Sequence, residues 1–150
     1  MKKLSLPFLA VCSLLLAGCA SVPMASASAD AEGKQFAPQP GRANIYISRG
    51  LGVGSALVFQ TILDGRIAGA LAPNTYQLLS VPAGQHTLIV TATENVDQTT
   101  LTVQSGRNYF VEVGVSMGWT RGHAKIKPVS DAEGRRQVLG SKRAAANSYQ

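Results

Sequence analysis

The fold is decided by residues 61–91, which read TILDGRIAGALAPNTYQLLSVPAGQHTLIVT. The pair Asp64-Gly65 favours a two-residue type I′ turn between two apolar runs, because aspartate tolerates and glycine readily adopts the positive φ that this turn requires. Pro82 presets φ for a second turn, Val81-Pro82-Ala83-Gly84. The residues after that turn alternate between apolar and polar, which is typical of a half-buried strand. The stretch therefore predicts consecutive antiparallel strands.

The same period of two continues on both sides of this stretch. Three further rows of alternating apolar residues show it: Ala43, Ile45 and Ile47; Leu101 and Val103; and Tyr109, Val111, Val113 and Val115. Each row can cover one side of a shared core. We count about seven to eight short strands at sandwich-like spacing, without strand–helix alternation. The expected fold is therefore mainly β, a small antiparallel β-sandwich in a single domain over residues 42–143.

The C-terminal part of the chain changes character. Ser130 with Glu133 fits a capping box, and Gly140 is a plausible stop, so a short C-terminal helix of about two turns is expected between them. Gly134 should weaken this helix. Residues 144–150 are small and polar, and we expect them to fray.

The N-terminus has the pattern of an export signal. Met1-Lys2-Lys3 gives a positive start, and the apolar run from Leu4 to Ala17 is too short to be a stable membrane-spanning helix. Directly after this run, Leu16-Ala17-Gly18-Cys19 closely resembles the lipobox of bacterial lipoproteins. That resemblance implies a signal peptide over residues 1–18, a cut between Gly18 and Cys19, and acyl chains on Cys19.

Two alternatives concern the same segment: an ordinary signal-peptide cleavage, and a chance cysteine in a segment that is not cleaved. Small-residue triplets such as Ala25-Ser26-Ala27 would be ordinary cleavage sites that give a soluble protein, although they lie far beyond the apolar run. The residue after Cys19 is Ala20 rather than the aspartate that resembles an inner-membrane retention signal, which favours the outer membrane. We expect the domain to face the periplasm.

Residues 19–41 are predicted to be a lipidated N-terminus and flexible tether. The stretch 20–41 is rich in Ala, Ser, Pro and Gly and shows neither helical nor strand periodicity. About 22 residues of such chain have a root-mean-square span of roughly 25 Å and could stretch to about 70 Å. The domain would then move freely near the membrane.

Four stretches carry a resemblance to a known family. They are RANIYISR at 42–49, TILDGRIAGAL at 61–71, TYQLLSVPAGQHTL at 75–88 and VQSGRNYFVEV at 103–113. Together they resemble an uncharacterised family of bacterial lipoproteins, domain-of-unknown-function family 2846, and the middle two are also similar to PEGA-type sandwich modules. The resemblance implies a small β-sandwich with no catalytic motif, and makes His86 a structural residue at a strand start.

Chemistry-bearing residues are sparse. His86 and His123 have no partner at metal-ligand spacing, so we predict neither a metal site nor a cofactor. Nothing resembles a nucleophile elbow, which leaves a hydrolase as the last-ranked hypothesis. The glycines of GLGVG at 50–54 are followed by a β-branched run, whereas a phosphate-binding loop needs a helix there. We expect a hairpin loop instead.

Charge is more informative. The formal net charge is +6, and seven of the basic residues lie between 121 and 143. Such a basic end would be attracted to lipid headgroups, lipopolysaccharide phosphates or peptidoglycan carboxylates, although a solvated face is the alternative. Trp119 beside Arg121 could stack on a sugar or a partner chain, or simply cap the core. The candidate binding residues are Trp119, Arg121, Arg135 and Arg136.

Three hypotheses follow. The first is a lipid-anchored, non-enzymatic interaction or structural module of the cell envelope, with an envelope protein as a possible partner. The second is a binding module for an envelope glycan, such as peptidoglycan, or for an anionic lipid such as lipopolysaccharide. The third is a hydrolase. Nucleic acid is disfavoured as a partner because of the expected compartment and the lack of aromatic residues among the basic ones.

Overall fold

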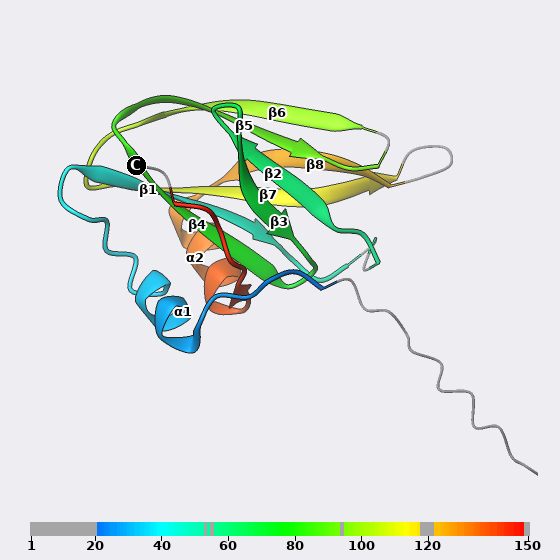
Figure 1. Cartoon of the computed structure of the whole chain (residues 1–150), viewed down its shortest axis with the longest axis horizontal. Helices are drawn as coiled ribbons and strands as arrows, with labels where there is room; N and C mark the ends of the chain where they lie inside the picture. The colour runs from blue at the N-terminus through cyan, green and yellow to red at the C-terminus, as the bar shows by residue number, and fades with distance from the viewer. Residues whose placement is uncertain (1–20, 53, 55, 94, 118–121, 149–150) are drawn as a thin grey trace, which may run out of the picture.

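Two β-sheets lie face to face, and both helices lie on the outer side of one of them (Figure 1). The computed structural model describes residues 21–52, 54, 56–93, 95–117 and 122–148. Its elements are α1 (Ala27–Gly33), β1 (Arg42–Arg49), β2 (Phe59–Leu63), β3 (Arg66–Leu71), β4 (Thr75–Pro82), β5 (Gly84–Thr91), β6 (Val96–Val103), β7 (Asn108–Met117), β8 (Gly122–Val129), α2 (Asp131–Leu139) and β9 (Lys142–Arg143). The predicted mainly β fold with a C-terminal helix is confirmed.

The strand directions differ in part from the prediction. One sheet has the order β8-β7-β1-β4-β9 and the other the order β3-β2-β5-β6. The β1–β7 and β4–β9 pairs are parallel, so the first sheet is mixed rather than purely antiparallel. Alternation in sequence shows which face a residue occupies, but it carries no information about the direction of a partner that is distant in sequence.

The turns that link neighbouring strands were predicted correctly. Asp64 and Gly65 have φ values of 49° and 77° and join β2 to β3. Ala83 separates β4 from β5, directly after Pro82. Both turns join strands that follow one another in sequence. Their residues form the turn by themselves, without contacts to distant parts of the chain.

The main core lies between the sheets. It is formed by the inward rows of both, with fully buried Ile45, Ile47, Phe59, Leu63, Leu88 and Val90 among its members. A second cluster, here called the outer cluster, lies on the opposite face of the five-stranded sheet and comprises Phe36, Tyr46, Tyr76, Leu78, Phe110, Val129 and Val138. The rings of Tyr46 and Phe110 stack with centroids 5.0 Å apart. The helices cover this outer cluster.

The structure corrects the predicted flexible tether over residues 19–41 for its described part, which begins at residue 21. From Ala27 to Gly33 the chain is helical, with Ser26 as the N-cap that accepts a hydrogen bond from the Ala29 N–H. Beyond the helix, Phe36 packs on Tyr46 and Phe110. Alanine is the best helix former, so the composition that resembles a linker also suits a short helix once a sheet is present to pack against.

The predicted frayed tail over 144–150 is also corrected for its described part. Ala144 is fully buried, and the Asn147 N–H donates to the Ala68 carbonyl at 2.8 Å. Residues 142–147 therefore run from the edge of β4 to the edge of β3 and close one side of the sandwich. The small side chains that suggested fraying are the ones that fit into this narrow seam.

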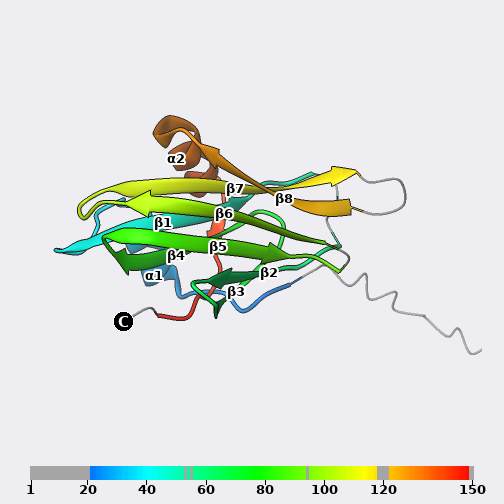
Figure 2. The same cartoon turned by 90° about the horizontal axis from the view of Figure 1, so that it is seen from above.

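The opposite side of the sandwich is closed by side chains. Asn95 exchanges two hydrogen bonds with the backbone of Ala124, at 2.8 and 2.9 Å, and the Ile126 N–H donates to the Asp97 carboxylate at 2.7 Å. These contacts tie β6 to the free edge of β8, which lies beside it in Figure 2. A free strand edge promotes aggregation, and these side chains occupy its backbone groups.

Helix α2 was predicted correctly in its cap but not in the role of Gly134. Ser130 accepts a hydrogen bond from the Glu133 N–H, as a capping box requires, and the helix ends at Gly140. Gly134 is buried, and a Cβ at this position would overlap the ring of Phe110 on β7. The glycine therefore allows the helix to approach the sheet closely.

No helix in the described part of the chain has the length and apolar character needed to cross a bilayer.

We predict that Gly134→Ala lowers the free energy of unfolding by about 1–3 kcal/mol, because overpacking against Phe110 outweighs the higher helix propensity of alanine. Gly140→Ala is the matched control. Gly140 has φ −81°, and the nearest atom that an added Cβ would meet is the Arg136 carbonyl oxygen at 3.5 Å, an ordinary contact distance. Urea unfolding measures both. Equal stability of the two variants would contradict the close approach.

We further predict that Asp97→Asn destabilises the fold at pH 7 by about 1–2 kcal/mol, because hydrogen bonds to charged groups are the stronger ones. The hydrogen bond from the Ile126 N–H lowers the pKa of Asp97 despite partial burial, and the charge of Lys125 lowers it further. A lowered folded-state pKa gives stability that is present above the unfolded value of about 3.9 and is lost as pH falls through the folded value.

The variant should therefore approach the stability of the unmodified protein in acid, which urea unfolding between pH 7 and acid pH measures. Asp131→Asn is the control, since this exposed residue makes only an i,i+4 pair with Arg135. If Asp97→Asn lost the same free energy of unfolding at every pH, the shape of the side chain rather than its charge would determine the stability of this edge.

Candidate functional site

A groove lies on the outer face of β1 and β4, beside the outer cluster. It consists of two adjoining hollows of about 560 Å³ and about 200 Å³. Both are lined by Gln39, Leu78, Ser80 and Arg143. The larger adds Arg42 and the tail residues Ala146, Asn147 and Ser148, and the smaller adds Glu32, Ala37, Asn44 and Tyr46. We call the two together the groove.

The floor of the groove follows from strand alternation. In the antiparallel register, Asn44 lies opposite Ser80, and Tyr46 lies opposite Leu78. Neighbours along each strand, such as Ile45 and Leu79, point into the main core. The floor is therefore polar at the end near Ser80 and aromatic at the end near Tyr46.

One wall of the groove is the segment that contains α1. The Tyr46 hydroxyl donates to the Gly33 carbonyl at 2.8 Å, and the Tyr76 hydroxyl donates to the Asp30 carbonyl at 3.2 Å. Burial raises the pKa of Tyr46 to about 12, so its hydroxyl remains a donor at neutral pH. The two tyrosines on neighbouring strands thereby fix the C-terminal half of this short helix on the sheet.

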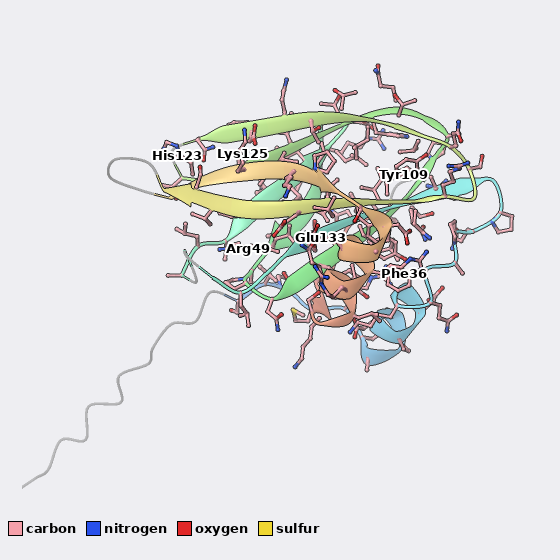
Figure 3. All side chains as sticks on the ribbon, turned by 180° about the vertical axis from the view of Figure 1, so that it is seen from behind. Phe36, Arg49, Tyr109, His123, Lys125 and Glu133 are labelled. Atoms are coloured by element: carbon pink, nitrogen blue, oxygen red, sulfur yellow. The ribbon has the colours of Figure 1, made fainter. Side chains whose placement is uncertain are left out.

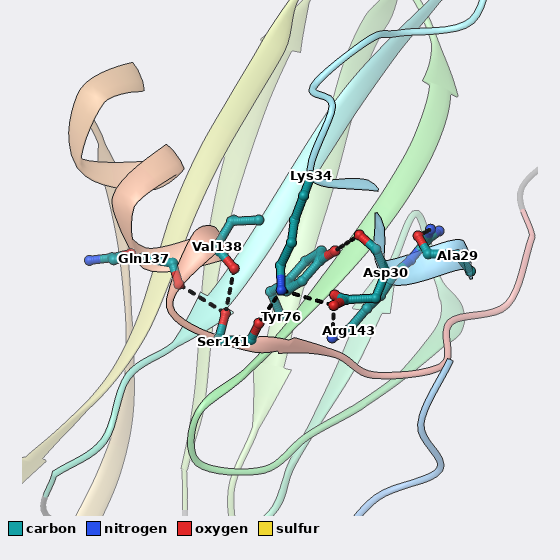
Figure 4. Close-up of polar contacts among 8 residues, drawn as sticks. All are labelled: Ala29, Asp30, Lys34, Tyr76, Gln137, Val138, Ser141 and Arg143. Atoms are coloured by element: carbon teal, nitrogen blue, oxygen red, sulfur yellow. Dashed lines mark hydrogen bonds and ion pairs between the residues drawn. The ribbon is translucent and has the colours of Figure 1, made fainter. Parts of the chain in front are cut away.

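Asp30 and Lys34 connect α1 to the other wall, the C-terminal segment (Figure 4). The Lys34 ammonium group donates to the Asp30 carboxylate and to the Ser141 carbonyl, both at 2.8 Å, and the Arg143 N–H donates to Asp30 at 3.0 Å. Burial raises the pKa of Asp30, but the hydrogen bond and positive charge of Lys34 and the hydrogen bond from the Arg143 N–H outweigh it, and the net shift is downward. The carboxylate is thus ionised where it joins the two walls.

The groove carries two guanidinium groups. Arg42 donates to the side chain of Ser80 at 3.0 Å and to its carbonyl, and Arg143 donates to the Ala29 carbonyl at 2.7 Å. Among the groove residues that the structure describes, Glu32 is the only acid. Guanidinium, amide and hydroxyl donors together suit a carboxylate or phosphate ligand. The donors that line the groove are therefore chemically compatible with an anionic ligand.

Of the four candidate binding residues predicted from sequence, the structure describes Arg135 and Arg136. Trp119 and Arg121 fall outside the described residues, as do Gly18 and Cys19 of the predicted lipidation site. Arg135 donates to Asp131 at 2.6 Å and stacks over the ring of Phe36, 4.5 Å from its centroid. Arg136 is exposed on α2. Neither arginine lines the groove, so the structure does not join them to Arg42 and Arg143.

The histidines do not form a reactive centre in the described part of the chain. His86 Nδ1 lies 2.6 Å from the Asp64 carboxylate, and its Nε2 lies 2.9 Å from the Pro82 carbonyl oxygen. The pair resembles half of a catalytic triad, but the nitrogen that would activate a nucleophile is occupied by the backbone. His86 instead ties the Asp64 turn to the start of β5.

Asp64 is ionised in this arrangement. Burial raises its pKa, yet hydrogen bonds from His86 and from the Thr87 N–H, the latter at 2.8 Å, lower the pKa more. Figure 3 shows that His123 lies on β8 beside Lys125, away from Tyr109 at the other end of the sandwich. Within the described ranges, no three His, Cys, Asp or Glu side chains form a group that could hold a metal ion.

Comparisons with known proteins show which family this chain belongs to. A family described as "Protein of unknown function (DUF2846)" matches residues 39–125. The chain belongs to this family. A Haemophilus influenzae relative named "Uncharacterized protein" is 32% identical over 127 residues, which are 84% of this chain and 76% of that protein. No solved structure matches.

The match to the DUF2846 family covers β1 to β7 and the first part of β8. It therefore includes Arg42, Leu78 and Ser80 of the groove but not Arg143 or the tail. Sequence reasoning missed the groove because Arg42 and Arg143 stand at opposite ends of the domain. Arg143 belongs to the basic C-terminal end, but the sequence pattern does not show which of the basic residues line the same groove.

Proposed function

We propose that this DUF2846 protein is a lipid-anchored, non-catalytic interaction or structural module of the bacterial cell envelope. The observation that carries the proposal is Leu16-Ala17-Gly18-Cys19, placed directly at the end of a short apolar run. A single acyl chain binds a membrane only marginally, whereas two or more hold firmly. A thioether-linked diacylglyceryl group on Cys19 would therefore keep the domain at a membrane permanently.

The proposed location is the outer membrane, with the domain facing the periplasm. Ala20 follows Cys19, where an aspartate would favour retention in the inner membrane. The only other cysteine, Cys12, lies within the predicted signal peptide. A mature chain that begins at Cys19 has no partner for an internal disulfide, so packing and hydrogen bonds must hold the fold.

A non-catalytic role is favoured by the chemistry of the described residues. The larger hollow of the groove is lined by hydrogen-bond donors but by no pair of side chains that could act as acid and base. In the Asp64–His86 pair, the second ring nitrogen of His86 is already occupied by the Pro82 carbonyl oxygen. A hydrolase would need a nucleophile within hydrogen-bond reach of a base. Similarity to PEGA-type modules, which the hairpin and turn motifs suggested, stays a prediction.

The anchor is tested with Cys19→Ser in the full-length precursor. We expect the unmodified protein to fractionate with membranes and the variant to lose its lipid-dependent mass, because serine cannot form the thioether. Mass spectrometry of the mature N-terminus and membrane fractionation measure this. Inhibition of lipoprotein signal peptidase should also leave a slower-migrating precursor. Cys12→Ser is the control, and identical processing of both variants would exclude the anchor.

A second candidate function is the binding of an anionic envelope component in the groove. The observation that favours it is Arg143: its guanidinium is held by the Ala29 carbonyl, and no carboxylate of the described residues pairs with it. Lipopolysaccharide phosphates and peptidoglycan carboxylates both have the required charge. Binding through such contacts should weaken as salt is added.

We predict that Arg143→Gln weakens binding to isolated peptidoglycan or lipopolysaccharide about tenfold, which corresponds to the loss of one charge-assisted hydrogen bond. Glutamine retains a donor for the Ala29 carbonyl, so the fold should persist. Arg107→Gln removes the same charge from an exposed position outside the groove and should have little effect. Co-sedimentation at low and high salt measures both. Equal effects of the two substitutions would assign the binding to general surface charge.

A further inference from the structure

The described chain is fixed to the domain almost from its beginning. The Pro23 carbonyl accepts a hydrogen bond from the Ala145 N–H at 2.8 Å, and the Ala25 N–H donates to the Arg143 carbonyl at 3.0 Å. Met24 thereby pairs with Ala144 in an antiparallel bridge. The N-terminal segment is thus joined to the same C-terminal segment that closes the sandwich.

This attachment shortens the reach of an anchor at Cys19. Only Ala20, Ser21 and Val22 separate Cys19 from Pro23. A fully extended chain spans about 3.3–3.6 Å per residue, so Pro23 can lie at most about 14 Å from Cys19. The 22-residue tether predicted from composition would have reached about 70 Å. A lipid on Cys19 would therefore hold the folded domain against the membrane surface.

One end of the sandwich lies closest to this attachment. We call it the loop end. It is the end of the sandwich where β1, β3, β5 and β7 finish and where β2, β4, β6 and β8 begin. The strand registers show this through the pairs Arg49↔Thr75, Phe59↔Leu71, Thr91↔Val96 and Met117↔Gly122. The first described residues run toward this end in Figures 1 and 2. The turns at Asp64-Gly65, at Ala83 and at Ser105-Gly106 lie toward the opposite end.

The loop end carries exposed apolar side chains. Among the described residues, three of the six exposed large hydrophobic side chains lie on it: Leu51 (79% exposed), Val96 (64%) and Val58 (41%). A fourth, Met24 (47%), belongs to the attached N-terminal segment. The other two are Ile67 on β3 and Leu139 at the end of α2. Isolated exposed apolar residues are common, but their gathering at the end nearest the anchor suits an interfacial surface.

Part of the β1–β2 connection is held firmly despite this exposure. The buried guanidinium of Arg49 donates to the carbonyls of Leu57, at 2.6 Å, and Gly54, at 2.7 Å, and lies over the ring of Phe59. These contacts hold Gly54 and Leu57, next to Val58, at the C-terminal end of this connection. Exposed Lys142, beside the first residue of β4, adds a positive charge at this end that an anionic lipid surface would attract.

We propose that the loop end rests on the phospholipid bilayer, with Leu51, Met24 and Val96 at the level of the headgroups. The proposal rests on the lipid anchor at Cys19 proposed above. In this orientation the groove residues Arg42 and Ser80, which lie toward the opposite end of β1 and β4, stay away from the bilayer. The lipid anchor and the loop end then act together, since the first keeps the second within reach of the membrane.

The test uses the full-length protein purified with its native lipid and reconstituted in vesicles of phosphatidylethanolamine and phosphatidylglycerol. The mature chain has no free thiol once Cys19 is acylated, so a single introduced cysteine can carry an environment-sensitive fluorophore. The probe sites are Leu51→Cys and Val96→Cys at the loop end. The controls are Ile67→Cys, an exposed apolar position on β3, and Ser105→Cys at the opposite end.

We expect nitroxide-labelled lipids to quench the probes at 51 and 96 several-fold more than those at 67 and 105, and aqueous iodide to quench them less. Equal quenching at all four positions in a lipidated protein would overturn this proposal and leave the anchor intact. Shielding from iodide without quenching by lipid nitroxides would also overturn it, because a protein partner or second copy would then cover the loop end. A mass spectrum without acyl chains on Cys19 would overturn both proposals.

Discussion

An edge strand presents a row of unpaired N–H and C=O groups, and the edge of β4 is where this protein meets that constraint. Lys142 and Arg143 form β9 beside it, and the segment from Pro23 to Ala25 then pairs with residues 143–145. The N- and C-terminal parts of the described chain thus meet at one seam. The position of α1, the walls of the groove and the short connection to Cys19 all depend on this pairing.

The two sides of the sandwich are closed by different means. On one side, backbone pairing by residues 142–147 bridges β4 to β3, and on the other, the side chains of Asn95 and Asp97 bind the backbone of β8. Such satisfied edges protect the domain, because exposed strand edges recruit other chains. The ionised state of Asp97 links the second closure to pH.

The same seam connects structure to the proposed function. Because Arg143 belongs to β9, the pairing that closes the sheet also brings its guanidinium to the groove, near Arg42. Because the N-terminal segment pairs with the same strand, a lipid at Cys19 would hold the loop end at the bilayer. The walls of the groove and the proposed orientation at the membrane thus depend on one set of backbone hydrogen bonds.

The sequence by itself determined the mainly β sandwich, the turns at Asp64-Gly65 and Pro82, and the Ser130 cap of α2, since each of these depends on residues that are neighbours along the chain. Only the tertiary structure decided the parallel β1–β7 pair, the helix within the expected tether, the docked tail and the groove. These features depend on hydrogen bonds and packing between residues distant in sequence, such as Tyr46 with Gly33 or Gly134 with Phe110. Composition reports how flexible a segment would be alone, whereas the free energy of docking depends on the surface that the rest of the fold provides.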